Sequence, residues 1–290
     1  MIEPQQGQFL GLDPQGFHAV RYLDWRAPSG ASGRTAICVH GLTRNSRDFD
    51  FLAEVLVAND TPITRVICPD IAGRGKSDWL GDPNAYGYPQ YLADMTALIA
   101  RLDVEAVDWV GTSMGGLIGM SLAALPKSPI RRLVLNDIGP VISKASLQRI
   151  SDYVGLDYRF SSTEALEKHL RKIHAPFGPL TDAQWQHMAL HSQRQIDGGN
   201  LGLAYDPAIA ENVKRAIAGV HIWSLWDQIT CPVLVLHGAD SDILSAETAQ
   251  EMTERGPKAE LITFAGVGHA PALMARDQVD IVTEWLSKTA

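Results

Sequence analysis

The chain has 290 residues, of which 46% are hydrophobic, enough for one sizeable α/β domain carrying an inserted subdomain. Two independent large domains are not expected. The 25 basic and 33 acidic residues give a formal net charge of -8, which disfavours nucleic acid or an anionic membrane as a partner, because both attract a concentrated positive field. A neutral small molecule is the expected partner. The sequence gives no indication of whether the protein forms oligomers.

The cysteines and the N-terminal residues indicate the cellular compartment of the protein. Cys38, Cys68 and Cys231 are an odd number, and each lies in or beside an apolar run, so they are interpreted as buried free thiols of a reducing compartment. Residues 1–7 lack the basic stretch and apolar centre of a signal peptide, and no apolar run reaches membrane-spanning length. These features predict a soluble, cytoplasmic protein.

The chain opens with a predicted hairpin and continues with alternating strands and helices. Residues 9–12 and 17–25 flank the turn Asp13-Pro14-Gln15-Gly16. Six short apolar runs predict buried parallel strands at 35–39, 65–68, 107–110, 132–135, 232–236 and 260–264. Helical patterns occur at 48–57, 88–102, 114–125, 246–255 and 278–287. This alternation predicts a doubly wound, mostly parallel sheet of the α/β class.

Residues 140–220 interrupt that alternation. Four amphipathic helices are predicted there, at 143–154, 163–173, 181–195 and 207–218, without a strong strand pattern. The predicted organisation is therefore a single core domain in two parts, 1–139 and 221–290, with a helical lid inserted between them at 140–220.

The segment Gly111-Thr112-Ser113-Met114-Gly115 carries the strongest chemical signal. It follows a predicted strand and precedes a predicted helix, which is the context in which a Gly-x-Ser-x-Gly turn lifts a serine hydroxyl clear of a sheet. Glycines two residues on either side leave room for the backbone to fold back. Ser113 is therefore the candidate nucleophile, the alternative being a small residue in a tight turn.

A serine hydroxyl needs a base to take its proton, and imidazole titrates near neutral pH. His269 follows the last predicted strand in a glycine-containing loop, whereas the histidines of the insertion are interpreted as solvated. The histidine needs a carboxylate partner. Asp242 is favoured over Asp240 because Ile243 and Leu244 could anchor its loop, and Asp137, after the preceding strand, is a third candidate.

Two backbone amides are expected to stabilise the oxyanion that forms when serine attacks a carbonyl. One should belong to Met114, which follows the nucleophile. The other should come from His40-Gly41-Leu42-Thr43 after the first buried strand, and Leu42 is the preferred residue. The side chains of Leu42 and Met114 should then line the substrate pocket.

No residue pattern calls for a cofactor. His187 and His191 have the i, i+4 spacing of metal ligands but lack the glutamate of His-Glu-x-x-His, so no metal site is predicted. Residues 111–119 lack the glycine spacing of a dinucleotide fingerprint, and nothing requires a flavin or nucleotide.

Five motifs in order give the chain a family resemblance: His40-Gly41, residues 69–78 (PDIAGRGKSD), the turn around Ser113, residues 238–242, and Gly268-His269. Together they resemble the α/β-hydrolase fold superfamily, in the lid-bearing branch of carboxylesterases and carbon–carbon bond hydrolases. The resemblance spans about residues 20 to 287 except the insertion. It implies a Ser, Asp, His order of catalytic residues. Serine at the nucleophile position distinguishes the chain from the haloalkane dehalogenases and epoxide hydrolases, which use aspartate.

The expected function is hydrolysis of carboxylic esters by a serine esterase through an acyl-enzyme, without a cofactor. One alternative is a carbon–carbon bond hydrolase of a dienoic ring-cleavage product, for which Arg44 and Arg47 could clamp the substrate carboxylate. The residues are also compatible with an acyltransferase. An alternative from another class is a ligand receptor that retains the fold without turnover.

Overall fold

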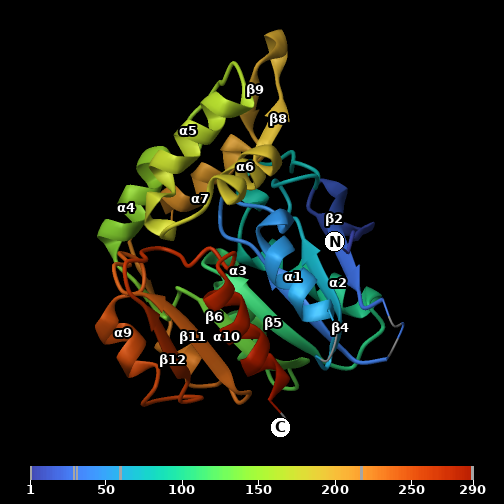
Figure 1. Cartoon of the computed structure of the whole chain (residues 1–290), viewed down its shortest axis with the longest axis vertical. Helices are drawn as coiled ribbons and strands as arrows, with labels where there is room; N and C mark the ends of the chain where they lie inside the picture. The colour runs from blue at the N-terminus through green and yellow to red at the C-terminus, as the bar shows by residue number, and fades with distance from the viewer. Residues whose placement is uncertain (1, 29, 31, 59–60, 216–217, 289–290) are drawn as a thin grey trace.

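A computed structural model describes residues 2–28, 30, 32–58, 61–215 and 218–288. An eight-stranded sheet in the order β1-β2-β4-β3-β5-β6-β11-β12 crosses the molecule (Figure 1). The strands are β1 (Gln5–Asp13), β2 (Gly16–Arg26), β3 (Arg34–Val39), β4 (Ile63–Pro69), β5 (Val107–Thr112), β6 (Ile130–Asn136), β11 (Val233–Gly238) and β12 (Glu260–Phe264). Among the described residues of this sheet, only the β1–β2 and β2–β4 pairs are antiparallel, so the predicted hairpin and mostly parallel sheet are confirmed.

Helices cover both faces of the sheet. One face packs on α1 (Asp50–Val57) and α10 (Arg276–Ser287), whose Leu56 and Trp285 share a core with strand residues such as Val110. The other face packs on α2 (Tyr88–Arg101), α3 (Met114–Ala123), α8 (Trp223–Trp226) and α9 (Ala246–Glu251). Strands of a doubly wound sheet are buried on both sides, which explains their continuous apolar sequence runs.

The insertion between β6 and β11 stands beyond the carboxyl ends of the parallel strands (Figure 1). It contains α4 (Lys144–Tyr153), α5 (Thr163–Ile173), α6 (Asp182–His191) and α7 (Ala210–Arg215). Two small antiparallel pairs accompany them: β7 (Val141–Ile142) with β10 (Val220–His221), and β8 (Gln193–Gln195) with β9 (Leu201–Leu203). The insertion has an apolar cluster of its own, which includes Leu166 and Trp185 and reaches Met274 near the carboxyl terminus of the chain.

Several predicted boundaries in the insertion are wrong. The helix expected at 181–195 ends at His191, because the next residues pair with β9. The last predicted helix, 207–218, is a 3-10 turn at Pro207–Ile209 followed by α7, and its residues 216–217 lie outside the described residues. Short 3-10 helices also occur at η1 (Ser46–Phe49), η2 (Pro83–Ala85), η3 (Ala175–Phe177) and η4 (Asp197–Gly199).

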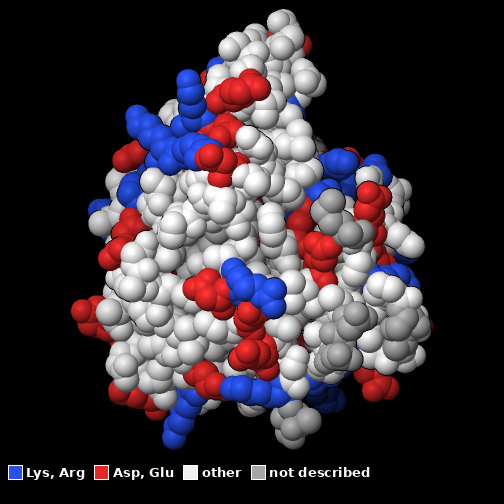
Figure 2. Space-filling view, viewed as in Figure 1, with Lys and Arg blue, Asp and Glu red and all other residues white. Residues whose placement is uncertain are grey.

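Charged side chains of both signs are mixed on the surface. Figure 2 shows acidic and basic side chains interspersed over one face, with a group of basic side chains over α5 beside acidic ones.

All three cysteines are free, and Cys38 and Cys68 are buried as expected, whereas Cys231 is only partly buried. Among the described residues, no helix combines the length and apolar character needed to cross a membrane.

Candidate active site

Ser113 occupies a sharp turn between β5 and α3. Its φ of 52° and ψ of -113° lie in a region that non-glycine residues seldom adopt, and such strain clusters at functional sites. A side chain at Gly111 would collide with the backbone of Gly115, and one at Gly115 would collide with Val39 of the neighbouring strand. The two glycines therefore allow the helix to begin directly against the sheet with Ser113 at the corner.

His269 lies between Ser113 and a buried carboxylate. Its Nε2 is 3.0 Å from Ser113 Oγ, and its Nδ1 is 2.7 Å from Oδ2 of Asp137. The Asp137 side chain is fully buried and that of His269 is 15% exposed. A carboxylate accepts from Nδ1–H, so Nε2 is left as the acceptor for the serine proton. The structure thus brings Ser113 and His269 together, as the sequence predicted.

The prediction of Asp242 as the carboxylate partner of His269 is wrong. The Asp242 side chain is 50% exposed and accepts a hydrogen bond from Nη2 of Arg149 in α4 at 3.0 Å. Asp240 is also exposed. The third candidate, Asp137, holds the position instead, because β6 and β11 are parallel neighbours and the first loop residue after β6 already reaches the histidine.

The end of β11 and the loop after it, which was expected to supply the acid, instead supply hydrogen-bond donors to Asp137. Gly238 N–H donates to Asp137 Oδ1 at 2.8 Å, and Ser241 Oγ–H donates to Oδ2 at 2.5 Å. These bonds compensate for burying the carboxylate and orient it toward His269. Ser241 was not identified from the sequence. Its position in the turn after a strand could have suggested a supporting role, although no pattern there distinguishes a donor from a turn former.

Asn136 is a second residue that the sequence analysis missed. Its amide nitrogen donates to the carbonyl of Pro271 at 2.8 Å and to Thr112 Oγ1 at 3.0 Å. These bonds tie the ends of β5 and β6 to the loop that carries His269. The backbone amide of Ser113 also donates to the Asn136 carbonyl at 3.1 Å, so one residue links the segments that present all three side chains.

His40 fixes the loop that follows β3. Its Nε2 accepts from the Ile71 amide at 3.0 Å, so Nδ1 carries the proton and donates to the Gly41 carbonyl at 2.7 Å. Burial lowers the pKa of His40 to about 4. The neutral ring therefore holds the Gly41 carbonyl pointing toward His40. Because C=O and N–H of a trans peptide point in opposite directions, the Leu42 N–H points away from His40.

Leu42 and Met114 line one cavity together with Ser113. Within the described residues, neither of their backbone amides donates a hydrogen bond to a protein acceptor. Met114 is the first residue of α3, where backbone amides have no partner within the helix and the helix dipole favours negative charge. The two residues predicted to supply the oxyanion donors therefore share a cavity wall with Ser113.

Arg74 stabilises the loop that carries Leu42 through hydrogen bonds to its backbone. Its guanidinium is fully buried and donates to the carbonyls of Leu42 (2.9 Å) and Ala72 (2.8 Å) and to the hydroxyl of Tyr91 (2.9 Å). In the described part of the chain it has no carboxylate within ion-pair distance. The Leu42 peptides are thus held from two sides, by His40 and by Arg74.

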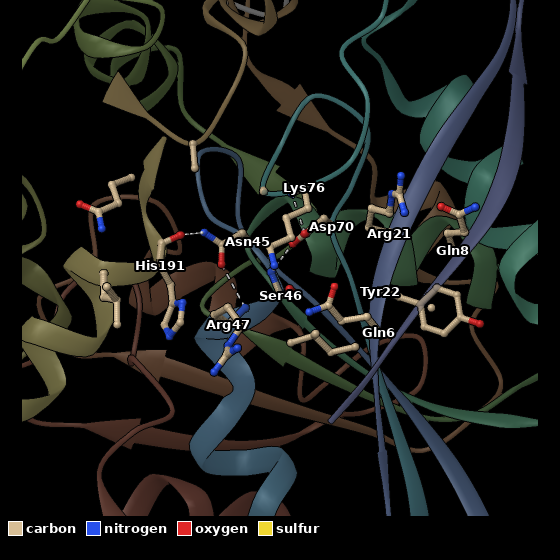
Figure 3. Close-up of a pocket in the computed structure, with 16 residues that line it drawn as sticks. Gln6, Gln8, Arg21, Tyr22, Asn45, Ser46, Arg47, Asp70, Lys76 and His191 are labelled. Atoms are coloured by element: carbon tan, nitrogen blue, oxygen red, sulfur yellow. Dashed lines mark hydrogen bonds between the residues drawn. The ribbon is translucent and has the colours of Figure 1, made fainter. Parts of the chain in front are cut away.

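The cavity above Ser113 has a volume of about 300 Å³ and a mostly apolar wall. Its aliphatic lining comes from both the core and the insertion: Leu42, Leu117, Ile142, Leu147, Ile150, Ile209, Val213, Val220 and Ile243. A larger, open groove of about 750 Å³ lies elsewhere, along β1, β2 and the start of η1, and Ser113 does not line it (Figure 3). The site with nucleophile geometry is therefore the smaller and more apolar one.

The insertion also contacts the segment that carries His269. The Gly268 amide donates to the carbonyl of Pro176 in η3 at 2.6 Å. At the neighbouring loop, Ser146 Oγ in α4 donates to the carbonyl of Asp242 at 2.5 Å. The insertion thus touches both loops that lie next to the Ser113, His269 and Asp137 side chains.

The histidines of the insertion are packed, which corrects their interpretation as solvated residues. The His169 ring lies 4.3 Å from that of Tyr158, and the His174 ring stacks on Phe177 at 4.5 Å. Burial lowers the pKa of His169, and that of His174 well below its usual value. Tertiary packing of this kind leaves no local signal in a polar helical sequence.

A parallel sheet wrapped by helices, a strained serine turn and a histidine–carboxylate pair at its carboxyl edge define a hydrolase of the α/β class. The chain belongs to the alpha/beta hydrolase family, whose profile matches residues 36–281. It is 44% identical to the 3-hydroxybutyrate-oligomer hydrolase of Cupriavidus necator over 98% of both chains. It is also 28% identical to an esterase of Mycobacterium tuberculosis, covering 82% of this chain and 75% of that protein. A solved alpha/beta hydrolase from Novosphingobium aromaticivorans superposes with a TM-score of 0.86 at 35% identity over 99% of both chains.

Proposed function

We propose that the protein is a serine hydrolase that cleaves carboxylic esters through an acyl-enzyme intermediate. The observation that carries this proposal is the hydrogen-bonded series from Ser113 Oγ through the His269 ring to Asp137, at the floor of an apolar cavity. Ser113 is the nucleophile, His269 the general base and acid, and Asp137 the carboxylate that orients the imidazole and stabilises its protonated form.

In the first half-reaction, Ser113 Oγ attacks the ester carbonyl carbon while His269 Nε2 takes the hydroxyl proton. The carbonyl oxygen becomes an oxyanion that accepts hydrogen bonds from the amides of Leu42 and Met114. When the C–O bond breaks, His269 returns the proton to the departing alkoxide, which leaves as an alcohol. The acyl group then remains on Ser113.

In the second half-reaction, water replaces the alcohol. His269 takes a proton from water, the resulting hydroxide attacks the acyl carbon, and the proton passes to Ser113 Oγ as the acid leaves. Each oxyanion amide contributes roughly 3 kcal/mol to lowering the barrier, on the scale measured for a single donor in another serine hydrolase. No metal or organic cofactor has a step in this reaction.

We infer that the substrates are short oligomeric esters of hydroxy acids. The support is the 44% identity, over nearly the whole chain, to a hydrolase named for 3-hydroxybutyrate oligomers. The aliphatic wall of the cavity suits the short, branched acyl unit of such an oligomer, whose ester-linked units are uncharged up to the terminal carboxylate. We also infer that residues 140–220 act as a lid, since residues of the insertion form part of the cavity wall.

The arginines considered for a carbon–carbon bond hydrolase are already engaged. Arg44 donates to Asp48 through Nε at 2.9 Å and to Ser192 at 2.9 Å, and Arg47 donates to Asp50 at 2.6 Å. A guanidinium neutralised by a carboxylate is a weak clamp for a second carboxylate. Ester hydrolysis is therefore the better-supported reaction.

The first test is labelling with a serine-directed fluorophosphonate followed by peptide mapping. We expect the adduct on Ser113 of the wild-type protein and no adduct on Ser113→Ala. As a matched control, Ser121→Ala changes a serine of α3 that is hydrogen-bonded within its own helix, and it should label like wild type. Labelling of Ser113→Ala at the wild-type rate would refute the assignment.

Substrate class is tested separately, by measuring kcat/KM for 3-hydroxybutyrate dimers and trimers and for nitrophenyl esters of increasing acyl length. Cleavage of the oligomers with higher kcat/KM than that of long-chain nitrophenyl esters supports the proposed substrates. Efficient labelling without hydrolysis of any ester would eliminate the esterase and favour acyl transfer to another acceptor or a carbon–carbon reaction.

A further inference from the structure

A cluster of two histidines and one aspartate lies outside the candidate active site, where α6 of the insertion meets the core. His187 and His191 lie one turn apart on α6, with ring centroids 4.6 Å apart. Asp50 is the first residue of α1, and its Oδ2 is 3.4 Å from His187 Nε2. One ligand atom from each residue lies within 4.8 Å of the other two.

The Asp50 carboxylate has one oxygen to spare. Its Oδ2 accepts from Nε of Arg47 at 2.6 Å, whereas Oδ1 is buried and has no hydrogen-bond partner among the described residues. The whole residue is only 7% exposed. A buried carboxylate oxygen without a donor costs free energy, and such an orphan calls for an explanation such as a bound ion.

The imidazoles can take part in metal coordination, because a neutral ring binds a metal through a nitrogen lone pair. His187 Nε2 lies 3.1 Å from the Arg47 carbonyl, and since a carbonyl only accepts, Nε2–H is the donor in this structure. A metal bound at Nε2 would replace this hydrogen bond. Arg47 also holds the Asp50 carboxylate, through Nε at 2.6 Å.

The cluster can be reached from solvent. His191 lines the open groove of about 750 Å³, together with Arg47, Asn45 and Lys76 (Figure 3). In that view the His191 ring extends beside Arg47, and the Asn45 side chain is bonded to the His191 carbonyl. None of the three cluster residues lines the cavity at Ser113, so an ion here would not take part in ester cleavage directly.

We propose that Asp50, His187 and His191 bind a divalent transition metal ion of the zinc type. Two imidazole nitrogens and one carboxylate oxygen form a ligand set that zinc accepts, and water would complete its coordination. The sequence alone did not predict this site, because the third ligand is supplied by α1, far away along the chain. A bound ion would link α6 of the insertion to α1 of the core.

The test is isothermal titration of the metal-stripped full-length protein with Zn²⁺, accompanied by the visible absorption of bound Co²⁺. We expect one saturable site in the wild-type protein and at least a ~100-fold loss of affinity in the double variant His187→Ala/His191→Ala, since loss of outer-sphere partners alone costs 10–100-fold. His221→Ala, which changes an exposed histidine of β10, is the matched control and should bind like wild type.

Asp50→Asn keeps the shape of the carboxylate and removes its charge, so it serves if the double variant does not fold. We expect it to bind Zn²⁺ at least ~10-fold more weakly. Zn²⁺ should also raise the melting temperature of the wild-type protein and not that of Asp50→Asn. Absence of saturable binding to the wild-type protein, or unchanged affinity in both the double variant and Asp50→Asn, would overturn the proposal.

Discussion

The loops that follow β6 and β11 begin side by side at one edge of the sheet, and both carry carboxylates in opposite surroundings. Asp137, after β6, is fully buried and accepts hydrogen bonds from Gly238, Ser241 and His269. Asp242, after β11, is half exposed and is paired with Arg149. The position of each loop at the sheet edge brings both carboxylates near His269. Burial and the hydrogen-bond donors around Asp137 decide that Asp137, and not Asp242, accepts the hydrogen bond from His269 Nδ1.

The largest expected effect separates the two carboxylates by activity. Asp137→Asn should lower kcat for a nitrophenyl ester by ~10⁴-fold, because an amide leaves the imidazole in the wrong tautomer and unsupported in its charged form. Asp242→Asn is the matched substitution and should stay within about twofold of wild type, as exposed changes usually do. The measurement is the steady-state kinetics of the two variants. An equal loss of kcat in Asp242→Asn and Asp137→Asn would contradict the assignment of Asp137 as the carboxylate that supports His269.

The same contrast between buried and exposed groups predicts how stability depends on pH. His40 has a pKa of about 4 in the folded protein against 6.5 for the free side chain, so between these values the unfolded chain binds more protons. Its contribution to stability is therefore complete above about pH 6.5 and is lost as the pH falls to about 4. At pH 4.5 the loss should be ~2–3 kcal/mol.

The check is urea denaturation at pH 7 and pH 4.5. His40→Gln removes the titrating group. Between pH 7 and pH 4.5, the decrease in the free energy of unfolding should therefore be ~2–3 kcal/mol smaller for His40→Gln than for the wild type. His221→Gln changes an exposed histidine and should retain the wild-type difference. Equal pH dependence in wild type and His40→Gln would contradict the burial argument.

A smaller effect tests the support that the β11 loop gives to Asp137. Ser241→Ala removes the donor to Oδ2 and should lower kcat roughly tenfold with KM unchanged, corresponding to ~1–2 kcal/mol. Ser245→Ala is the control, because Ser245 caps α9 and makes no bond to Asp137. It should cost ~1 kcal/mol of stability and leave kcat intact. An equal drop in kcat for both variants would point to a general loosening of the loop.

The smallest effect concerns the exposed ion pair. Arg149→Ala removes the partner of Asp242, and both side chains are about half exposed. Exposed pairs contribute under ~1 kcal/mol, so thermal denaturation should show only a small shift. A drop in kcat comparable to that of Ser241→Ala would mean that the Asp242 loop matters to the site through its link to α4.

Much of the fold and two of the three central side chains could be predicted from local patterns. The strands of the sheet appear as short apolar runs, and the turn at Ser113 depends on glycines within two residues of it. His269 follows the last strand in a glycine loop, which is also a local feature. These predictions needed no knowledge of which strands are neighbours.

The acid could not be predicted with the same reasoning. Asp137 and Asp242 both follow strands that end at one edge, and their difference lies in side-chain direction and in donors from a different loop. The three-residue strands β8 and β9 were missed because they are too short to show alternation. The packing of the insertion histidines, and the meeting of Asp50 with His187 and His191, likewise depend on distant contacts.

The hydrogen bond from Gly268 to Pro176 has a consequence for the timing of turnover. Gly268 precedes His269, the general base of the proposed reaction, and its amide donates to the insertion. If residues 140–220 act as the proposed lid, a movement of η3 that admits substrate would also break this hydrogen bond. Substrate entry and the alignment of the imidazole would then be coupled through one backbone contact.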